Sequence, residues 1–415
     1  MKDKKRVIWV FLIIFAIILT GGRMLAYSIN ITGYVRNYTG VLLQQNNKYS
    51  IVQNTISLNI EGSSDKVAFN VNPYIYQYPN ESVNIGLREA YLDIYLKFID
   101  LRIGKQEIIW GKADGVFITD IVSPKDLSNF LMPDFDEIRM GVTAVKADYY
   151  IGNNLLEFAW LPVFTPTQTP ENGSIWYIAP SFSVPVTYDN SKNNITSSLK
   201  NSDVFAKFSA LTSLIDFEIM VGYAWDDDPT IHIIKTIDSS KQLTAVTLIP
   251  EYHRLGIGGG SFSTTLGGFV LRGEGAFYNG KYFQSNNPSL YEGVVKKNYI
   301  DYLLGLDFTV WDIKLSSQFN QKIILNYDDN IVNDEYTNLV TFLASRRFLN
   351  DTLNLELFTY VGLNDQGLLI RPKVNYSVAD GFDITLGSNI FGGDSGMFGQ
   401  YNDNDIVYFK VKYSF

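Results

Sequence analysis

The chain has no cysteine among its 415 residues and only two histidines, His232 and His253. The lack of cysteine excludes a disulfide framework, thiolate chemistry and a lipid-modified N-terminal cysteine. Two histidines offer little general acid–base chemistry, and no G-x-S-x-G element or other known nucleophile motif accompanies them. We therefore predict no catalytic residue, no cofactor and no metal site, and we do not expect an enzyme.

Long hydrophobic runs are scarce as well. One unbroken apolar stretch, residues 7–19, follows four basic residues near the start of the chain. It is shorter than the ~20 residues that a spanning helix needs, which favours a cleaved signal peptide over an uncleaved membrane anchor. We expect a signal peptide at residues 1–26, cleaved after Ala26, and one domain at residues 27–415.

Basic residues are in the minority, 34 Lys and Arg against 43 Asp and Glu, and the formal net charge is −9. Such a charge argues against nucleic acid or an anionic lipid surface as a partner. Aromatic residues are abundant, with 27 tyrosines and 27 phenylalanines. This abundance is typical of proteins whose aromatic side chains mark two membrane interfaces.

Apolar and polar residues alternate along most of the chain from residue 28 onward. In residues 405–415 every second position from Val407 to Phe415 is apolar, and Lys410 and Lys412 lie between them. Because side chains alternate faces along a strand, such a segment has one apolar and one polar face. Similar segments of about ten residues recur, a length that suits tilted strands crossing a bilayer.

The connections alternate in length too. Tight turns such as residues 152–154 alternate with long polar stretches such as residues 162–202. Short periplasmic turns and long extracellular loops are typical of outer-membrane barrels. We predict an all-β, transmembrane, antiparallel up-and-down β-barrel of about 18 strands (16–18), located in the outer membrane, with its first strand at 28–40 and its last at 405–415. Residues 243–249 form either an extra strand or part of a loop hairpin.

The last strand also resembles the closing strand of bacterial outer-membrane barrels, whose C-terminal Phe is read by the barrel-assembly machinery. The resemblance implies that this machinery is a partner through Phe415. The other expected partners are outer-membrane lipid and lipopolysaccharide. The oligomeric state, monomer or trimer, stays open.

Three segments carry a family resemblance: L-R-I-G-K-Q-E-I-I-W-G-K-A-D-G (101–115), V-S-P-K-D-L (122–127) and G-G-F-V-L-R-G-E-G-A-F-Y (267–278). Together they resemble the uncharacterised outer-membrane protein family DUF1302. A weaker likeness is to the alginate-export-type barrels. The resemblance implies a single large barrel that acts as a channel or transporter, without indicating its substrate.

The long stretch at residues 110–138 has two interpretations. It either folds inward as a constriction or plug, as porin loops do, or packs on the rim as an ordinary surface loop. We expect Trp110 at the outer membrane interface and a short helix starting at Pro124 with Ser123 as its N-cap. The constriction-loop candidates are Trp110, Asp114, Asp120, Lys125 and Asp126.

Charged residues at alternate strand positions are expected to face a wet lumen, because Lys or Arg facing lipid at the midplane costs ~2–4 kcal/mol. The pore-lining candidates are Arg102, Lys146, Arg272, Glu274, Lys314, Lys322, Arg371, Lys373, Lys410 and Lys412. They either form cross-strand salt bridges that hold the wall together or make a basic wall that selects anions. The acidic clusters at 134–137, 226–228 and 328–329 lack calcium-loop spacing and are expected to be solvated loop charge.

These features predict a porin-like channel or transporter that moves small solutes, anionic ones if the basic wall is selective, through a charged, loop-constricted lumen. One alternative is a carrier of hydrophobic molecules with a gap in its wall near Gly256–Gly260. The other is a structural or adhesive barrel with a sealed lumen.

Overall fold

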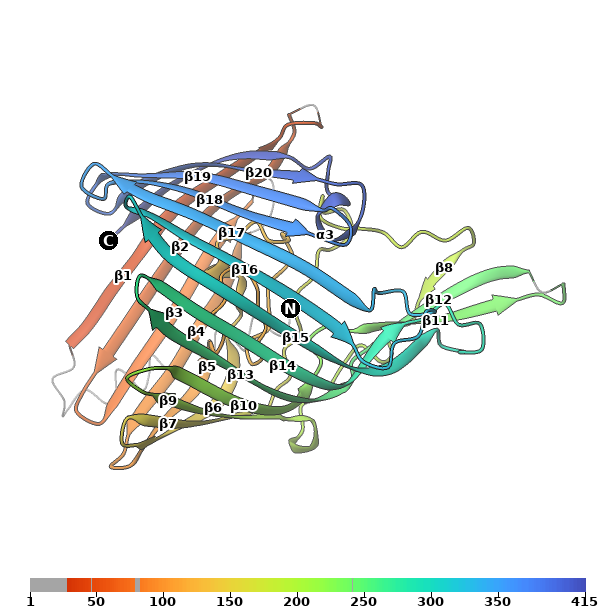
Figure 1. Cartoon of the computed structure of the whole chain (residues 1–415), viewed down its shortest axis with the longest axis horizontal. Coiled ribbons are helices and arrows are strands. Elements are labelled where there is room, and N and C mark those ends of the chain that lie inside the picture. The colour runs from red at the N-terminus through yellow and green to blue at the C-terminus, as the bar shows by residue number, and fades with distance from the viewer. Residues whose placement is uncertain (1–27, 46, 79–82, 241) are drawn as a thin grey trace.

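The structure is a computed structural model that describes residues 28–45, 47–78, 83–240 and 242–415. The expected signal peptide lies outside these residues. Eighteen strands form one antiparallel sheet that closes on itself as a tilted barrel (Figure 1). The predicted fold class and strand number are confirmed.

The first nine strands of the wall are β1 (Ser28–Leu42), β2 (Tyr49–Ser63), β3 (Val67–Gln77), β4 (Asn84–Tyr95), β5 (Ile99–Gln106), β6 (Val142–Ile151), β7 (Asn154–Leu161), β9 (Asp203–Leu211) and β10 (Asp216–Trp225). The other nine are β13 (Arg254–Leu266), β14 (Phe269–Gln284), β15 (Val294–Val310), β16 (Ile313–Ile324), β17 (Tyr336–Phe348), β18 (Leu353–Gly362), β19 (Leu368–Ala379), β20 (Phe382–Gly392) and β21 (Ile406–Ser414).

The barrel closes between the first and last strands. β21 pairs with β1 in antiparallel register from Ile406 opposite Leu42 to Ser414 opposite Tyr34. Gly33 and Phe415 then exchange two backbone hydrogen bonds of 2.9 Å each. The last residue of the chain is therefore part of the seam.

The two faces of the wall differ as the alternation predicts. On β21 the side chains of Val407 and Phe409 are exposed on the outside, whereas those of Tyr408 and Lys410 are buried inside. The exposed apolar residues form the surface that a barrel presents to lipid. Among the described residues, no helix is long and apolar enough to cross a membrane.

Three further strands lie outside the wall. β8 (Val186–Tyr188), β11 (Thr230–Ile237) and β12 (Leu243–Glu251) form a separate small sheet. The β11–β12 hairpin, here called the arm (residues 230–251), projects from the end of the barrel that carries the long loops (Figure 1). Residues 243–249 therefore belong to a loop hairpin and add no strand to the wall.

The core of the molecule lies inside the barrel, where residues 107–141, here called the lumen loop, pack against inward-facing residues of the wall. The lumen loop connects β5 to β6. Its short helix is α2 (Phe135–Ile138) and does not start at Pro124 as predicted. Lys125 instead forms an isolated β-bridge with Arg139. Ser123 does not cap a helix, since its hydroxyl accepts a hydrogen bond of 2.9 Å from the N–H of Ile108.

Candidate functional site

The lumen loop is fastened to the β14 side of the wall by two charged residues. The Glu274 carboxylate accepts hydrogen bonds from the N–H of Lys112 and from the N–H (3.2 Å) and hydroxyl (2.7 Å) of Thr119. Arg272 donates to the Lys112 carbonyl at 2.6 Å and to the Asp114 carboxylate. Because breaking these hydrogen bonds would leave charged groups unpaired in a closed interior, this part of the loop is held in place.

Gly115 lies where the loop meets β18. The Tyr360 hydroxyl donates to the Gly115 carbonyl at 2.8 Å. Gly115 has a φ of +71°, and a Cβ there would lie 2.5 Å from the Tyr360 hydroxyl and 2.7 Å from the Phe358 ring. Only glycine fits both the backbone conformation and the space.

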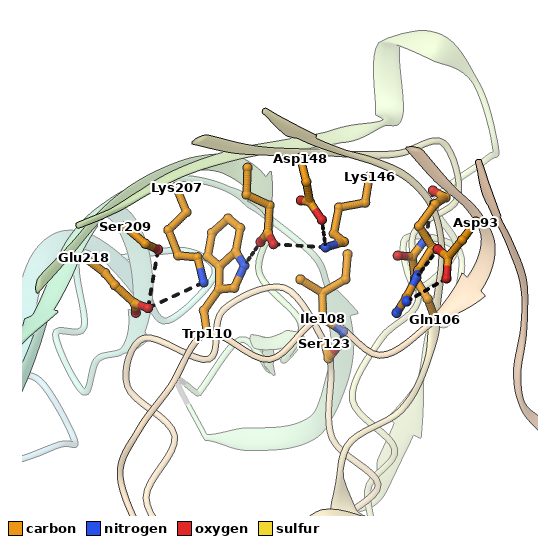
Figure 2. Close-up of polar contacts among 12 residues, drawn as sticks. Asp93, Gln106, Ile108, Trp110, Ser123, Lys146, Asp148, Lys207, Ser209 and Glu218 are labelled. Atoms are coloured by element: carbon orange, nitrogen blue, oxygen red, sulfur yellow. Dashed lines mark hydrogen bonds and ion pairs between the residues drawn. The ribbon is translucent and has the colours of Figure 1, made fainter. Parts of the chain in front are cut away.

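Trp110 lies inside the barrel, and the expectation of a place at the membrane interface is wrong. Its side chain is 2% exposed, and its indole N–H donates to Glu157 on β7. Glu157 also pairs with Lys146 at 3.1 Å, and Lys146 with Asp148 at 2.7 Å. Figure 2 shows the indole turned toward this polar row on the inner wall. The buried hydrogen bond from the Trp110 indole to the inward-facing Glu157 carboxylate thus outweighs the preference of Trp for the membrane interface.

The opposite side of the lumen loop meets basic wall residues. Lys410 lies 2.9 Å from the Asp134 carboxylate, and Arg36 lies 2.6 Å from Glu137. Burial raises the pKa of Asp134, but attraction to Lys410 and Lys373 outweighs burial and holds that pKa below its usual range. Asp134 and Glu137 of the acidic cluster at 134–137 are therefore paired inside the barrel, and for these two residues the expectation of solvated loop charge is wrong. Asp136 is exposed.

Arg88 reaches the lumen through a bulge in β4. Pro73 on β3 pairs with Leu87 on β4, and Asn72, the residue before Pro73, pairs with Glu89. Arg88, which lies between Leu87 and Glu89, therefore has no partner on β3. Proline cannot donate to the ladder and is tolerated in sheets at edges or bulges. The bulge turns the Arg88 guanidinium inward, where it lies 2.7 Å from Glu107 and donates to a backbone carbonyl of α2.

A cavity of about 480 Å³ lies between the lumen loop and the wall, toward the end of the barrel that carries the short turns. The wall contributes five basic side chains to its lining: Arg36, Arg88, Lys373, Lys410 and Lys412. The acidic side chains in the lining are Asp134, Asp136 and Glu137 from the lumen loop and Asp383 from β20. Basic wall and acidic loop thus face each other across the cavity.

A second cavity of about 340 Å³ continues toward the long-loop end along β1 to β4. Its lining includes the tyrosines Tyr34, Tyr38, Tyr74, Tyr76 and Tyr78. The two cavities share the residues Tyr34, Arg36, Ser57, Arg88 and Glu137. The two cavities therefore adjoin at these five residues, among them both arginines and Glu137.

The structure divides the predicted pore-lining residues into groups. Lys373, Lys410 and Lys412 line the cavity of about 480 Å³. Those that bond other wall residues or the lumen loop are Arg102, Lys146, Arg272, Glu274 and Arg371. Lys322 lines a third cavity of about 440 Å³ near the long loops. Lys314 is exposed on the inner face of β16.

The predicted constriction residues all lie in the lumen loop, but in different roles. Asp120 and Lys125 line the third cavity, and Asp126 lines the second. Trp110 and Asp114 attach the loop to the wall. The sequence candidates did not include Arg36, Arg88, Asp134 or Glu137, which stand at the contact between wall and loop. A proline inside a predicted strand was the available signal for Arg88.

A closed barrel of eighteen antiparallel strands, with an inward-folded loop and a charged interior, defines an outer-membrane β-barrel of the porin-like class. The chain belongs to the family described as Protein of unknown function (DUF1302), whose model matches residues 45–344. The family resemblance predicted from the three segments is confirmed. A search of curated proteins found no match to this sequence.

Solved structures of porin channels share this fold. OccK8 (OprE) of Pseudomonas aeruginosa is 11% identical with a TM-score of 0.55, covering 94% of this chain and 98% of that chain. OccAB3 of Acinetobacter baumannii is 10% identical with a TM-score of 0.54, covering 94% and 99%. OpdK of P. aeruginosa, in a structure with vanillate, is 7% identical with a TM-score of 0.55, covering 94% and 98%. At such identities the likeness establishes the fold alone.

Proposed function

We propose that the protein is a diffusion channel for small anionic solutes, and that its path runs along β1–β4 past Arg36 and Arg88. The observation that carries the proposal is the pair of adjoining cavities with five basic wall side chains in the lining of one of them. A positive wall raises the local concentration of anions and lowers that of cations.

The distribution of charge supports this path. Most of the acidic groups in the cavity of about 480 Å³ come from the lumen loop, and two of them are paired with Lys410 and Arg36. Within the described part of the chain, Lys412 has no such ion pair, and its ammonium lies 5.4 Å from the centre of the Tyr34 ring. A carboxylate such as vanillate, present in the OpdK structure, is a solute of the expected charge and size.

The carrier alternative finds less support in the wall. β13 pairs without interruption with β10 and β14 across Gly256–Gly260, the place where a lateral exit was expected. The sealed-barrel alternative is favoured by one observation, the dense packing of the lumen loop against both sides of the wall. Conductance separates a sealed barrel from a channel.

The test is a charge reversal at Lys412 in protein reconstituted into planar lipid bilayers. Lys412→Glu places a negative charge in the proposed path, and Lys314→Glu makes the same change on the inner face of β16, away from it. We expect ion-conducting steps from the unaltered protein and an anion-to-cation permeability ratio that falls about threefold in Lys412→Glu, as for one reversed charge in a hydrated pore. Lys314→Glu should change the ratio little.

Reversal potentials in a salt gradient give this ratio directly, and the gel mobility shift on heating shows that each variant is folded. A folded protein without conductance would establish the sealed barrel instead. Equal shifts in the two variants would place the path elsewhere in the lumen.

A further inference from the structure

The two histidines of the chain lie side by side at the base of the arm, although they are 21 positions apart in the sequence. The Nε2 atoms of His232 on β11 and His253, just before β13, are 2.9 Å apart. The carboxylate Oε2 of Glu251, the last residue of β12, lies 3.8 Å from His232 Nε2. Possible ligand atoms of these three residues all lie within 4.8 Å of one another. No other part of the described chain gathers three such groups in this way.

We propose that His232 Nε2, His253 Nε2 and the Glu251 carboxylate form a binding site for one divalent transition-metal ion of the zinc class. Two imidazole nitrogens and a carboxylate oxygen are a ligand set that such ions favour, and they leave a fourth position for water. The inference does not depend on the proposed channel function, because the site lies outside the barrel wall.

A fourth residue prepares His232 for this role. The Nδ1 atom of His232 lies 2.8 Å from the Glu292 carboxylate, so Nδ1–H can donate there and leave a lone pair on Nε2. A carboxylate behind a ligating histidine is the usual arrangement that orients the ring and raises its basicity. Glu292 comes from the connection between β14 and β15, and the site therefore joins three separate parts of the chain.

The surroundings restrict both rings. The His232 side chain is almost fully buried, and the His253 ring stacks on Tyr282 of β14 with centroids 3.8 Å apart. Two nitrogens bound to one tetrahedral zinc are about 3.3 Å apart, so the present separation needs to open by only a few tenths of an ångström. The separation of the two nitrogens is thus close to that of two ligands of one ion, and binding requires the rings to turn so that both lone pairs point at the ion.

Lys192 would compete with a metal ion for the Glu251 carboxylate. Its ammonium lies 2.6 Å from Glu251 Oε2, the same oxygen that faces His232. A bound cation would displace Lys192, whose side chain is 46% exposed and can turn to solvent. Removal of Lys192 should therefore strengthen metal binding, which distinguishes a real site from a chance cluster.

The experiment is calorimetric titration of Zn²⁺ into the detergent-purified full chain without a polyhistidine tag, with Ca²⁺ as the hard-ion control. We expect one Zn²⁺ per chain, binding more than tenfold weaker in His253→Gln and in Glu251→Gln, and about tenfold weaker in Glu292→Gln. Lys192→Gln should bind Zn²⁺ at least twofold tighter. Because the chain has no other histidine, Cu²⁺ in the same site should give an electron paramagnetic resonance spectrum with two nitrogen couplings.

Absence of Zn²⁺ binding by the folded protein overturns the proposal. So does binding that survives His253→Gln, or an affinity for Ca²⁺ equal to that for Zn²⁺, since either result assigns the ion to exposed carboxylates. Unchanged or weaker binding in Lys192→Gln would exclude Glu251 as a ligand.

Discussion

At the scale of single residues, the lumen depends on side chains whose direction is set by small departures from the regular wall. Arg88 points inward because β4 has one more residue than β3 opposite Pro73. A bulge is a usual way to re-aim one side chain in a sheet, and here it adds a second cation next to Arg36. Asp134 on the lumen loop faces the same cavity and pairs with Lys410 and Lys373 of the wall.

Asp134→Asn tests that balance. The change removes one of the four acidic groups from the cavity of about 480 Å³ and frees Lys410, so we expect a higher anion-to-cation permeability ratio, by about twofold. Reversal potentials measure it, and Asp329→Asn, a change at an exposed loop residue, is the matched control.

The pH dependence follows from the lowered pKa of Asp134. A carboxyl group with a lowered pKa contributes its ion pair at every pH above the ordinary carboxyl pKa and loses it only as the pH falls through the lowered value. The difference between Asp134→Asn and the unaltered protein should therefore be the same at about pH 7 and about pH 5. A difference that fades over this interval would contradict the assigned pairing with Lys410 and Lys373.

At the scale of elements, the wall strands could be predicted from the sequence and the path of the lumen loop could not. Each lipid-facing strand must be apolar at alternate positions, a constraint that can be recognised locally, and so the strands from residue 28 to residue 415 were found. The position of the lumen loop depends on pairs such as Asp134 with Lys410, which are 276 residues apart. Alternation alone carries no information about such pairs, and it also gave no indication that His232 and His253 lie side by side.

The conformation of the lumen loop can be tested at Gly115. In Gly115→Ala the new Cβ strains a backbone with positive φ and clashes with Tyr360, so the loop must shift away from β18. We expect a loss of about 1–3 kcal/mol in the free energy of unfolding and a larger single-channel conductance. Denaturant titration of the refolded protein in lipid vesicles measures the first, and bilayer recordings the second.

Gly152→Ala is the matched control for Gly115→Ala. Gly152, in the turn between β6 and β7, also has positive φ, at +60°, but a Cβ there would meet no atom within 4 Å. Gly152→Ala should therefore lower the free energy of unfolding only by the backbone strain, about 1 kcal/mol, and leave conductance unchanged. Equal effects of the two substitutions would show that the contact with Tyr360 does not position the loop.

At the scale of the whole molecule, closure is the step that gives every wall strand two neighbours. An open sheet of eighteen strands would leave unpaired backbone groups at both edges, which hydrocarbon does not tolerate. The closing register places Phe415 opposite Gly33, and so residues 406–415 must be present before the seam can form.

Deletion of Phe415 should therefore reduce the amount of assembled barrel, with little effect on the stability of the barrels that do form. The two hydrogen bonds with Gly33 are a small part of the β1–β21 ladder, whereas an aromatic last residue is the expected recognition signal for the assembly machinery. Phe415→Leu keeps the backbone hydrogen bonds and removes only the aromatic ring. If recognition dominates, both variants should give several-fold less heat-modifiable protein in outer-membrane fractions, with export across the inner membrane unchanged. If the hydrogen bonds dominate, only the deletion should lower the amount of heat-modifiable protein. Full assembly of both variants would exclude Phe415 as the signal.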